Sequence, residues 1–153
     1  MAAGGDPPAV TVHAPDQAAL ALALAGPRGV LLMSAPGAAG NIGIGWFQAL
    51  VAQALQTMPA DRIGPSPGRI GLSHEIVLDC GDAPSLALAA LRTGLRDLVL
   101  DPACPAFARV AAAAAEIGAR LRPARPPSLD LGRLDLRRAA ARATLAAWLT
   151  AAG

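Results

Sequence analysis

The sequence predicts an α/β protein with a mostly parallel sheet of four or five strands, and three observations support this prediction. Short apolar runs alternate with longer segments that have helical spacing. Two of these runs, Ile76–Leu78 and Leu98–Leu100, are followed at once by an aspartate. Such alternation is typical of right-handed strand–helix–strand units, in which helices cover a parallel sheet. We therefore expect a small three-layer α/β/α sandwich, with half of a (β/α)₈ barrel as the alternative.

The predicted strands are β-favouring or continuously apolar runs, as expected for strands buried in a parallel sheet. The third strand is the clearest, because Ile76, Val77 and Leu78 lead into a polar end at Asp79. The signal for the fifth strand is the weakest, because this segment is short and is indicated only by its position after a helix. In chain order the expected strands are Ala9–His13, Gly29–Met33, Glu75–Asp79, Asp97–Leu100 and Arg120–Pro123.

The predicted helices lie between these strands and are bounded by glycine or proline. Phe47, Leu50 and Val51 show the spacing that places apolar side chains on one helix face. Pro84 stands where a first helical residue needs no N–H donor. In chain order the expected helices are Gln17–Ala25, Trp46–Met58, Pro84–Thr93, Pro105–Ala119 and Leu134–Ala152.

The 153 residues predict one domain, residues 9–152, after a flexible Gly/Pro/Ala-rich tail at residues 1–8. A Pro/Gly-rich connection at residues 59–71 interrupts it. The layout suits a flavodoxin-like or Rossmann-like sandwich. No signal peptide opens the chain, no apolar run is long enough to insert into a membrane, and two cysteines make no disulfide framework. We expect a cytoplasmic protein.

The composition predicts self-association. Hydrophobic residues make up 54% of the chain and charged residues 16%, below the ~25% typical of soluble domains. A surface this poor in charge exposes apolar patches of the kind that mark interfaces, so we expect a homo-oligomer. The basic residues are all arginine, and many lie between Arg120 and Arg142. With 3% aromatic residues and no tyrosine, the chain lacks the stacking side chains of nucleic-acid-binding proteins.

The carboxyl ends of the predicted strands hold the candidate catalytic residues, because ligands of open α/β sheets bind there. Asp79 and Asp101 are candidates for general acid and base, although aspartate is also an ordinary turn and capping residue. If the first, third and fourth strands are neighbours, His13 converges with both carboxylates. Cys80 is a candidate nucleophile beside His13, or else a buried, inert residue.

The glycine-rich segment from Ser34 to Gly45 is the candidate ligand-binding loop, since it connects a strand to a helix. Free backbone N–H groups in such a loop can hold a small anion. The glycine spacing fits no dinucleotide fingerprint, and the absence of lysine excludes a P-loop. Alternatively, the loop exposes Ile42, Ile44 and Trp46 to a partner. The candidate ligand-binding residues are Ser34, Gly37, Gly40, Asn41, Gly43 and Asp82.

The sequence predicts no metal site and identifies no cofactor. His13, Cys80 and Cys104 form an untidy ligand set, because metals usually need three or four well-placed donors. Asp82 precedes Ala83-Pro84, so it is equally a candidate helix cap. His74 stands at the opposite end of its strand from Asp79 and is expected at the surface.

Two resemblances accompany these motifs. Arg96–Pro102 resembles the phosphoacceptor strand of response-regulator receiver domains, but that family needs a lysine that this chain lacks. Three segments, Ser34–Gly37, Leu78–Pro84 and Val99–Arg109, resemble small uncharacterised α/β proteins of alphaproteobacteria. This resemblance covers most of the chain and implies a fold without a function.

The leading functional hypothesis is a self-associating, non-catalytic cytoplasmic protein that binds a partner or a small ligand at the strand ends. It depends on the low charge and on the incomplete catalytic set. The alternative is a small enzyme acting on an anionic or carbonyl substrate. In that case Asp79 or Asp101 serves as acid or base, and the Ser34–Gly45 loop holds the anion.

Overall fold

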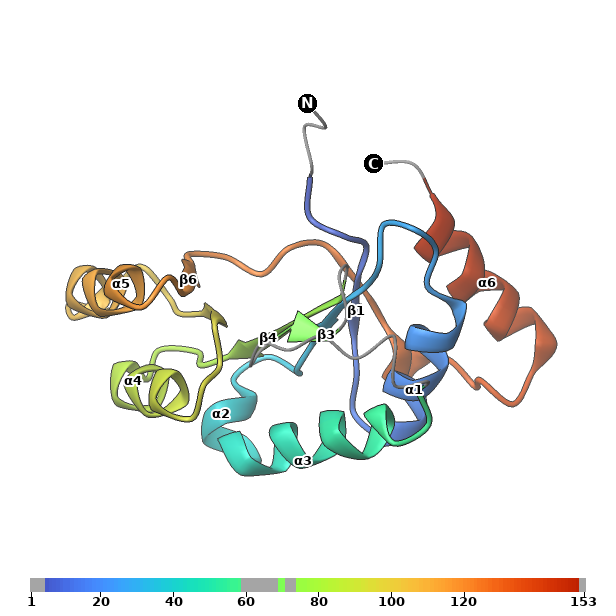
Figure 1. Ribbon diagram of the computed structural model, residues 1–153, viewed down its shortest axis with the longest axis horizontal. Helices are drawn as coiled ribbons and strands as arrows, with labels where there is room; N and C mark the ends of the chain where they lie inside the picture. The colour runs from blue at the N-terminus through green and yellow to red at the C-terminus, as the bar shows by residue number, and fades with distance from the viewer. Residues whose placement is uncertain (1–4, 59–68, 71–73, 152–153) are drawn as a thin grey trace.

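The computed structural model describes residues 5–58, 69–70 and 74–151, with strands at the centre and helices around them (Figure 1). Six strands are mutually parallel, and a seventh, β3 (Arg69–Ile70), pairs antiparallel with β4. The parallel strands are β1 (Ala9–Thr11), β2 (Leu31–Met33), β4 (His74–Asp79), β5 (Asp97–Val99), β6 (Arg120–Arg122) and β7 (Ser128–Asp130). The helices are α1 (Pro15–Leu24), α2 (Ala38–Asn41), α3 (Ile44–Leu55), α4 (Pro84–Arg92), α5 (Phe107–Glu116) and α6 (Ala139–Thr150).

The predicted α/β class with a mostly parallel sheet is confirmed and is consistent with a small Rossmann- or flavodoxin-like fold. The predicted strand number is wrong, because six parallel strands form instead of four or five. The additional strand, β7, lies between the predicted strand Arg120–Pro123 and the predicted helix Leu134–Ala152, where no strand was predicted. The last helix also begins later than expected, since a 3₁₀ turn at Leu131–Arg133 and a turn-rich segment precede α6.

The longest strand, β4, joins the two halves of the sheet. Its first half pairs with β2 through Glu75, Ile76 and Val77, and its second half pairs with β5 through Leu78 and Asp79. The complete strand order is β6–β5–β4–β2–β1–β7. From β1 to β6 the parallel strands therefore lie side by side in chain order, as in the half-barrel alternative, and β7 is added at the far edge beside β1.

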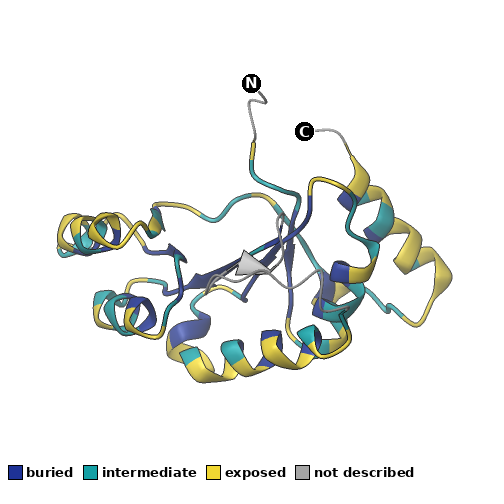
Figure 2. Ribbon diagram, in the orientation of Figure 1, coloured by how far each residue is buried: buried dark blue, intermediate teal, exposed yellow. Residues whose placement is uncertain are grey.

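The described α-helices cover one face of this sheet. Right-handed crossovers that advance in one direction place their helices on the same face. Buried side chains from all six helices accordingly join one core cluster, which includes Val10, Leu32 and Leu98 of the strands. In α3 this cluster receives the predicted apolar stripe that begins at Phe47. Figure 2 shows the buried strands at the centre and the exposed outer sides of the helices.

The opposite face carries a second, smaller cluster made of strand residues alone, Ala9, Leu31, Met33, Val77 and Val99. Among the described residues, the helices thus form one layer, where the predicted sandwich has two. The reason is the strand order: the connection from β6 to β7 reverses direction across the sheet, and its residues 123–127 contain no helix.

A buried ion cluster joins the first residue of β5, Asp97, to the last residue of β6, Arg122. Arg122 donates two hydrogen bonds to the carboxylate of Asp97, from Nε to Oδ1 and from Nη2 to Oδ2, each at 2.7 Å. Both residues are almost fully buried, at 6% and 7% exposure. Asp6 accepts a further bond from Arg122 at 2.5 Å and one from Arg120 at 2.7 Å. Of the predicted flexible tail, Asp6 is therefore held against the sheet.

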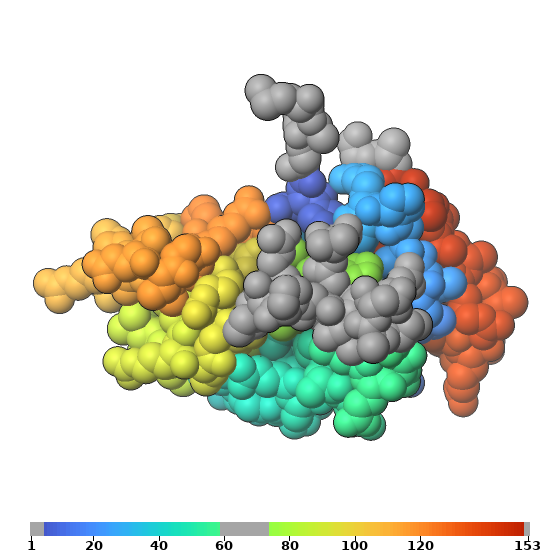
Figure 3. Space-filling model, viewed as in Figure 1, coloured from blue at the N-terminus to red at the C-terminus, as the bar shows by residue number. Residues whose placement is uncertain are grey.

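The two ends of the described chain lie on the same side of the molecule, opposite α3 (Figure 1). Figure 3 shows α5 and α6 at opposite ends of the long axis. No described helix is both long and apolar enough to cross a membrane. Most of the connection predicted at residues 59–71 falls outside the described residues.

Candidate functional site

Asp79 is a buried carboxylate among the predicted catalytic residues, at 4% exposure, and lies at the end of β4. Its Oδ1 accepts the backbone N–H of Gly81 at 2.8 Å, a turn that Gly81 permits because its φ is +57°. Its Oδ2 accepts a charged hydrogen bond from Nη1 of Arg125 at 2.6 Å. Both carboxylate oxygens are thus occupied by the protein itself.

Arg125 connects three strands of the sheet. In addition to Asp79, its guanidinium donates from Nη2 to Thr11 Oγ1 at 3.1 Å and to the carbonyl of Ser34 at 3.0 Å. Thr11 in turn shares a 2.8 Å hydrogen bond with Ser128. Arg125 lies in the segment between β6 and β7, so it fixes that segment against the ends of β1, β2 and β4.

Ser34, a predicted ligand residue, has a structural role beside this ion pair. Its hydroxyl accepts the backbone N–H of Asp79 at 2.9 Å and donates to the carbonyl of Ala35 at 3.1 Å. The side chain is almost fully buried. Sequence reasoning placed Ser34 and Asp79 at strand ends correctly but missed Arg125, whose signal is a single arginine between Pro123 and Pro126.

His13 and Asp130 form a second polar pair at the same edge. His13 Nε2 lies 2.7 Å from Asp130 Oδ1, and that oxygen also accepts the N–H of Gly132 at 2.9 Å. Burial opposes ionisation, but the hydrogen bonds from His13 and Gly132 hold the pKa of Asp130 below its ordinary value. A Cβ on Gly132 would lie 2.8 Å from the imidazole, so any larger residue there would require the ring of His13 to shift. The pair is partly exposed, and Asp130 can orient the imidazole of His13. Among the described residues, no nucleophile is hydrogen-bonded to this imidazole.

The expected convergence of His13, Asp79 and Asp101 does not occur. The first and third predicted strands are not neighbours, because β2 lies between β1 and β4. Asp101 is exposed, and its Oδ1 accepts the N–H of Ala103 at 2.9 Å, as in an ordinary turn. Asp82 does not cap α4, whose N-terminal residue lacks a side-chain cap. Catalytic and ligand-binding roles for these residues stay predictions.

Cys80 lies on the other side of the strand from Asp79, inside the helix-covered core, at 2% exposure. Burial, with a smaller contribution from the nearby Asp79 charge, raises the pKa of its thiol to about 12. Because the thiolate is the reactive form, Cys80 in this setting is a poor nucleophile.

We expect iodoacetamide at pH 8.5 to modify the partly exposed Cys104 and to spare Cys80 until the protein unfolds. Peptide mass spectrometry after timed labelling measures both rates.

The raised pKa also means that Cys80 contributes stability below pH 9.0, the ordinary thiol value, and that this stability is lost as the pH rises towards 12. The chain has no lysine or tyrosine whose titration would mask this loss. In Cys80→Ala, the free energy of unfolding should therefore depend less on pH between pH 9 and 12. Equal labelling of Cys80 and Cys104 in folded protein would contradict the prediction that Cys80 is protected.

The glycine-rich loop is more ordered than an open anion cradle. Gly37 and Gly43 adopt positive φ values of 65° and 92° and precede the helices α2 and α3. The N–H groups of Gly40 and Asn41 donate to the carbonyl of Gly37. The N–H of Gly43 likewise donates to the carbonyl of Ala38. These donors are therefore already bonded within the loop. Ile42 within the loop and Trp46 directly after it are each 45% exposed.

His74 is buried rather than at the surface as expected, and its Nδ1 accepts the N–H of Val30 at 3.1 Å. Among residues 5–58, 69–70 and 74–151, no three His, Cys, Asp or Glu side chains are grouped so that they could hold a metal ion.

No family model matches this sequence, and searches of curated proteins and of solved structures found no match either. The resemblance to alphaproteobacterial proteins therefore stays a prediction.

Proposed function

We propose that this protein is a non-catalytic, self-associating α/β protein whose interface includes Ile42 and Trp46. The observation that supports this most directly is the exposure of both side chains, 45% each, at the end of the glycine-rich loop. Ile42 is the residue that ends α2 and Trp46 stands in the first turn of α3, so the two flank the junction between these helices. Tryptophan is enriched among the residues that dominate binding energy at protein interfaces.

The bonding of the strand-end residues supports a non-catalytic function. A general acid or base needs a carboxylate that reaches the substrate, but both oxygens of Asp79 already have protein partners. Cys80 points into the helix-covered core. Among the described residues, no hydrogen bond joins a nucleophile to the remaining His13–Asp130 pair. The groups at this edge therefore hold strands and loops together, and the exposed apolar surface next to them is left for association. The two free cysteines agree with the cytoplasm as the proposed compartment.

Sedimentation velocity at micromolar concentration tests this proposal. We expect the wild-type chain to form an oligomer, and the double variant Ile42→Ser/Trp46→Ser to dissociate with a Kd about thirtyfold higher or more, because an interface tryptophan contributes about 2 kcal/mol or more. Ile117→Ser is the matched control, since Ile117 is 47% exposed and lies outside α2 and α3, at the C-terminal end of α5. A monomeric wild type, or an equal effect of the control substitution, would contradict the proposal.

A further inference from the structure

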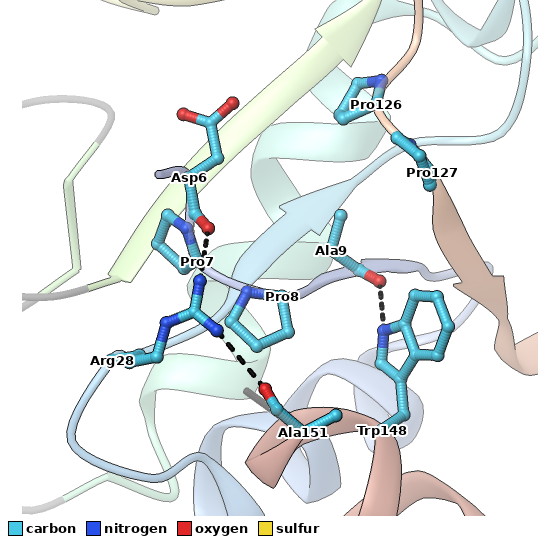
Figure 4. Close-up of a pocket in the computed structure, with 9 residues that line it drawn as sticks. All are labelled: Asp6, Pro7, Pro8, Ala9, Arg28, Pro126, Pro127, Trp148 and Ala151. Carbon is cyan, nitrogen blue, oxygen red and sulfur yellow. Dashed lines mark hydrogen bonds between the residues drawn. The ribbon is translucent and has the colours of Figure 1, made fainter. Parts of the chain in front are cut away.

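A cavity of about 420 Å³ lies at the N-terminal edge of the sheet, and none of the predicted site residues lines it. Four segments that are distant in sequence build it: residues 6–9 at the start of β1, Arg28 before β2, the connection before β7 and the end of α6 (Figure 4). Its apolar walls are Pro7, Pro8, Pro126, Pro127 and the ring of Trp148. The volume lies within the ~300–1,000 Å³ range of small-molecule sites.

The walls of this cavity are rigid before any ligand binds. Proline has a fixed φ and no N–H group, so four wall residues lose little freedom on binding and leave no unsatisfied donor. Trp148 is fixed by a 2.8 Å hydrogen bond from its Nε1 to the carbonyl of Ala9. The ring face is thus held as one wall. A preformed apolar pocket of this kind is typical of a ligand site rather than a packing defect.

One cationic group lines the cavity, the guanidinium of Arg28. Its described hydrogen bonds go to neutral carbonyls, from Nη1 to Ala151 at 3.2 Å and from Nη2 to Asp6 at 3.0 Å. The carboxylate of Asp6 points away from Arg28 (Figure 4) and is bound by Arg120 and Arg122. Within the described part of the chain, no ion pair involves Arg28, so its charge is available to an anion. A guanidinium has five N–H donors, and two bonds leave donors for a carboxylate.

From this combination we infer that the cavity binds a small aromatic or branched aliphatic carboxylate. The apolar part of the ligand lies among the prolines and Trp148, and its carboxylate lies on Arg28. An uncharged molecule of the same shape would bury the guanidinium without a counter-charge, and a cation would be repelled. This site is independent of the proposed self-association, because Ile42 and Trp46 do not line the cavity.

Titration with 2-naphthoate, followed by ¹H–¹⁵N NMR, tests the inference. The chain contains two tryptophans, so the indole N–H signals of Trp148 and Trp46 can be assigned with a Trp46→Phe variant. We expect a saturable shift of the Trp148 signal and no shift of the Trp46 signal. We expect naphthalene-2-methanol, the uncharged analogue, to bind about tenfold more weakly or worse, because a charged hydrogen bond contributes about 1.5–3 kcal/mol.

Substitutions at Arg28 separate the charge from the shape of the cavity. Arg28→Gln should weaken 2-naphthoate binding about tenfold or more, and Arg28→Lys should restore part of it. Arg92→Gln on α4 is the control for loss of one exposed arginine and should bind as the wild type does. Binding that is unchanged in Arg28→Gln overturns the inference. So does equal binding of the acid and the alcohol by the wild type, a result that does not depend on the variants folding.

Discussion

Arg122→Met should lower the free energy of unfolding by about 3–5 kcal/mol, because removal of one partner from a buried ion pair leaves the other charge uncompensated. Asp97 is 7% exposed and receives both of its charged hydrogen bonds from Arg122. Asp6 loses a contact at the same time. Methionine keeps most of the side-chain length, so the loss reports the charge rather than a large cavity. Urea denaturation followed by circular dichroism measures the change, provided that the m-value is constant.

Two further variants show whether burial is the cause. Arg137→Met removes an arginine that pairs with Asp135 at 2.9 Å but is 91% exposed, so the stability should hardly change. Arg122→Met/Asp97→Leu removes both charges and should recover much of the loss, as expected when a buried pair is replaced by apolar residues. A loss below about 1 kcal/mol in Arg122→Met would contradict a structural role for this cluster.

Asp79→Asn is expected to cost about 2–3 kcal/mol of unfolding free energy. The amide oxygen can still accept the Gly81 N–H, but the amide nitrogen cannot accept the hydrogen bond from Arg125. Arg125 then loses its counter-charge, although water can reach its partly exposed side chain and reduce the loss. The same urea titration measures the effect.

Asp101→Asn is the matched control for Asp79→Asn, because Asp101 is exposed and accepts one turn hydrogen bond. It should cost less than about 1 kcal/mol. If Asp79→Asn proved as stable as the wild type, the carboxylate would have no structural role, and the interpretation of Asp79 as a catalytic acid or base would regain support. The pair of variants therefore separates the two functional hypotheses without a known substrate.

The strands with a strong local signal were predicted well. Ile76–Leu78 and Leu98–Leu100 are continuous apolar runs, and β4 and β5 form there. β7 was missed because Ser128-Leu129-Asp130 has neither an apolar run nor β-branched residues. It forms because its place beside β1 supplies hydrogen bonds, a tertiary effect that local propensity does not contain.

The hydrogen-bond partners of the candidate site residues could not be predicted from local sequence spacing, because they also depend on tertiary structure. Asp79 and Arg125 are 46 residues apart, and His13 and Asp130 are 117 residues apart. Each pair depends on the path of the segment from β6 to β7, which crosses the helix-free face. A sequence shows which residues end a strand, but not which distant side chain the topology brings to them. Asp79 was therefore placed correctly at the end of its strand, but the hydrogen bonds that already occupy its carboxylate were not predicted.

The place of β7 has a consequence for biosynthesis. The ribosome completes β1 first, and β2, β4, β5 and β6 can each pair with the preceding strand as they emerge. The outer edge of β1 waits for Ser128–Asp130, near the end of the chain. Until then the nascent protein carries an unpaired strand edge, the feature through which β-proteins aggregate. Ser128–Asp130 thus protect the edge of the first strand, and they do so only after the other parallel strands have been synthesised.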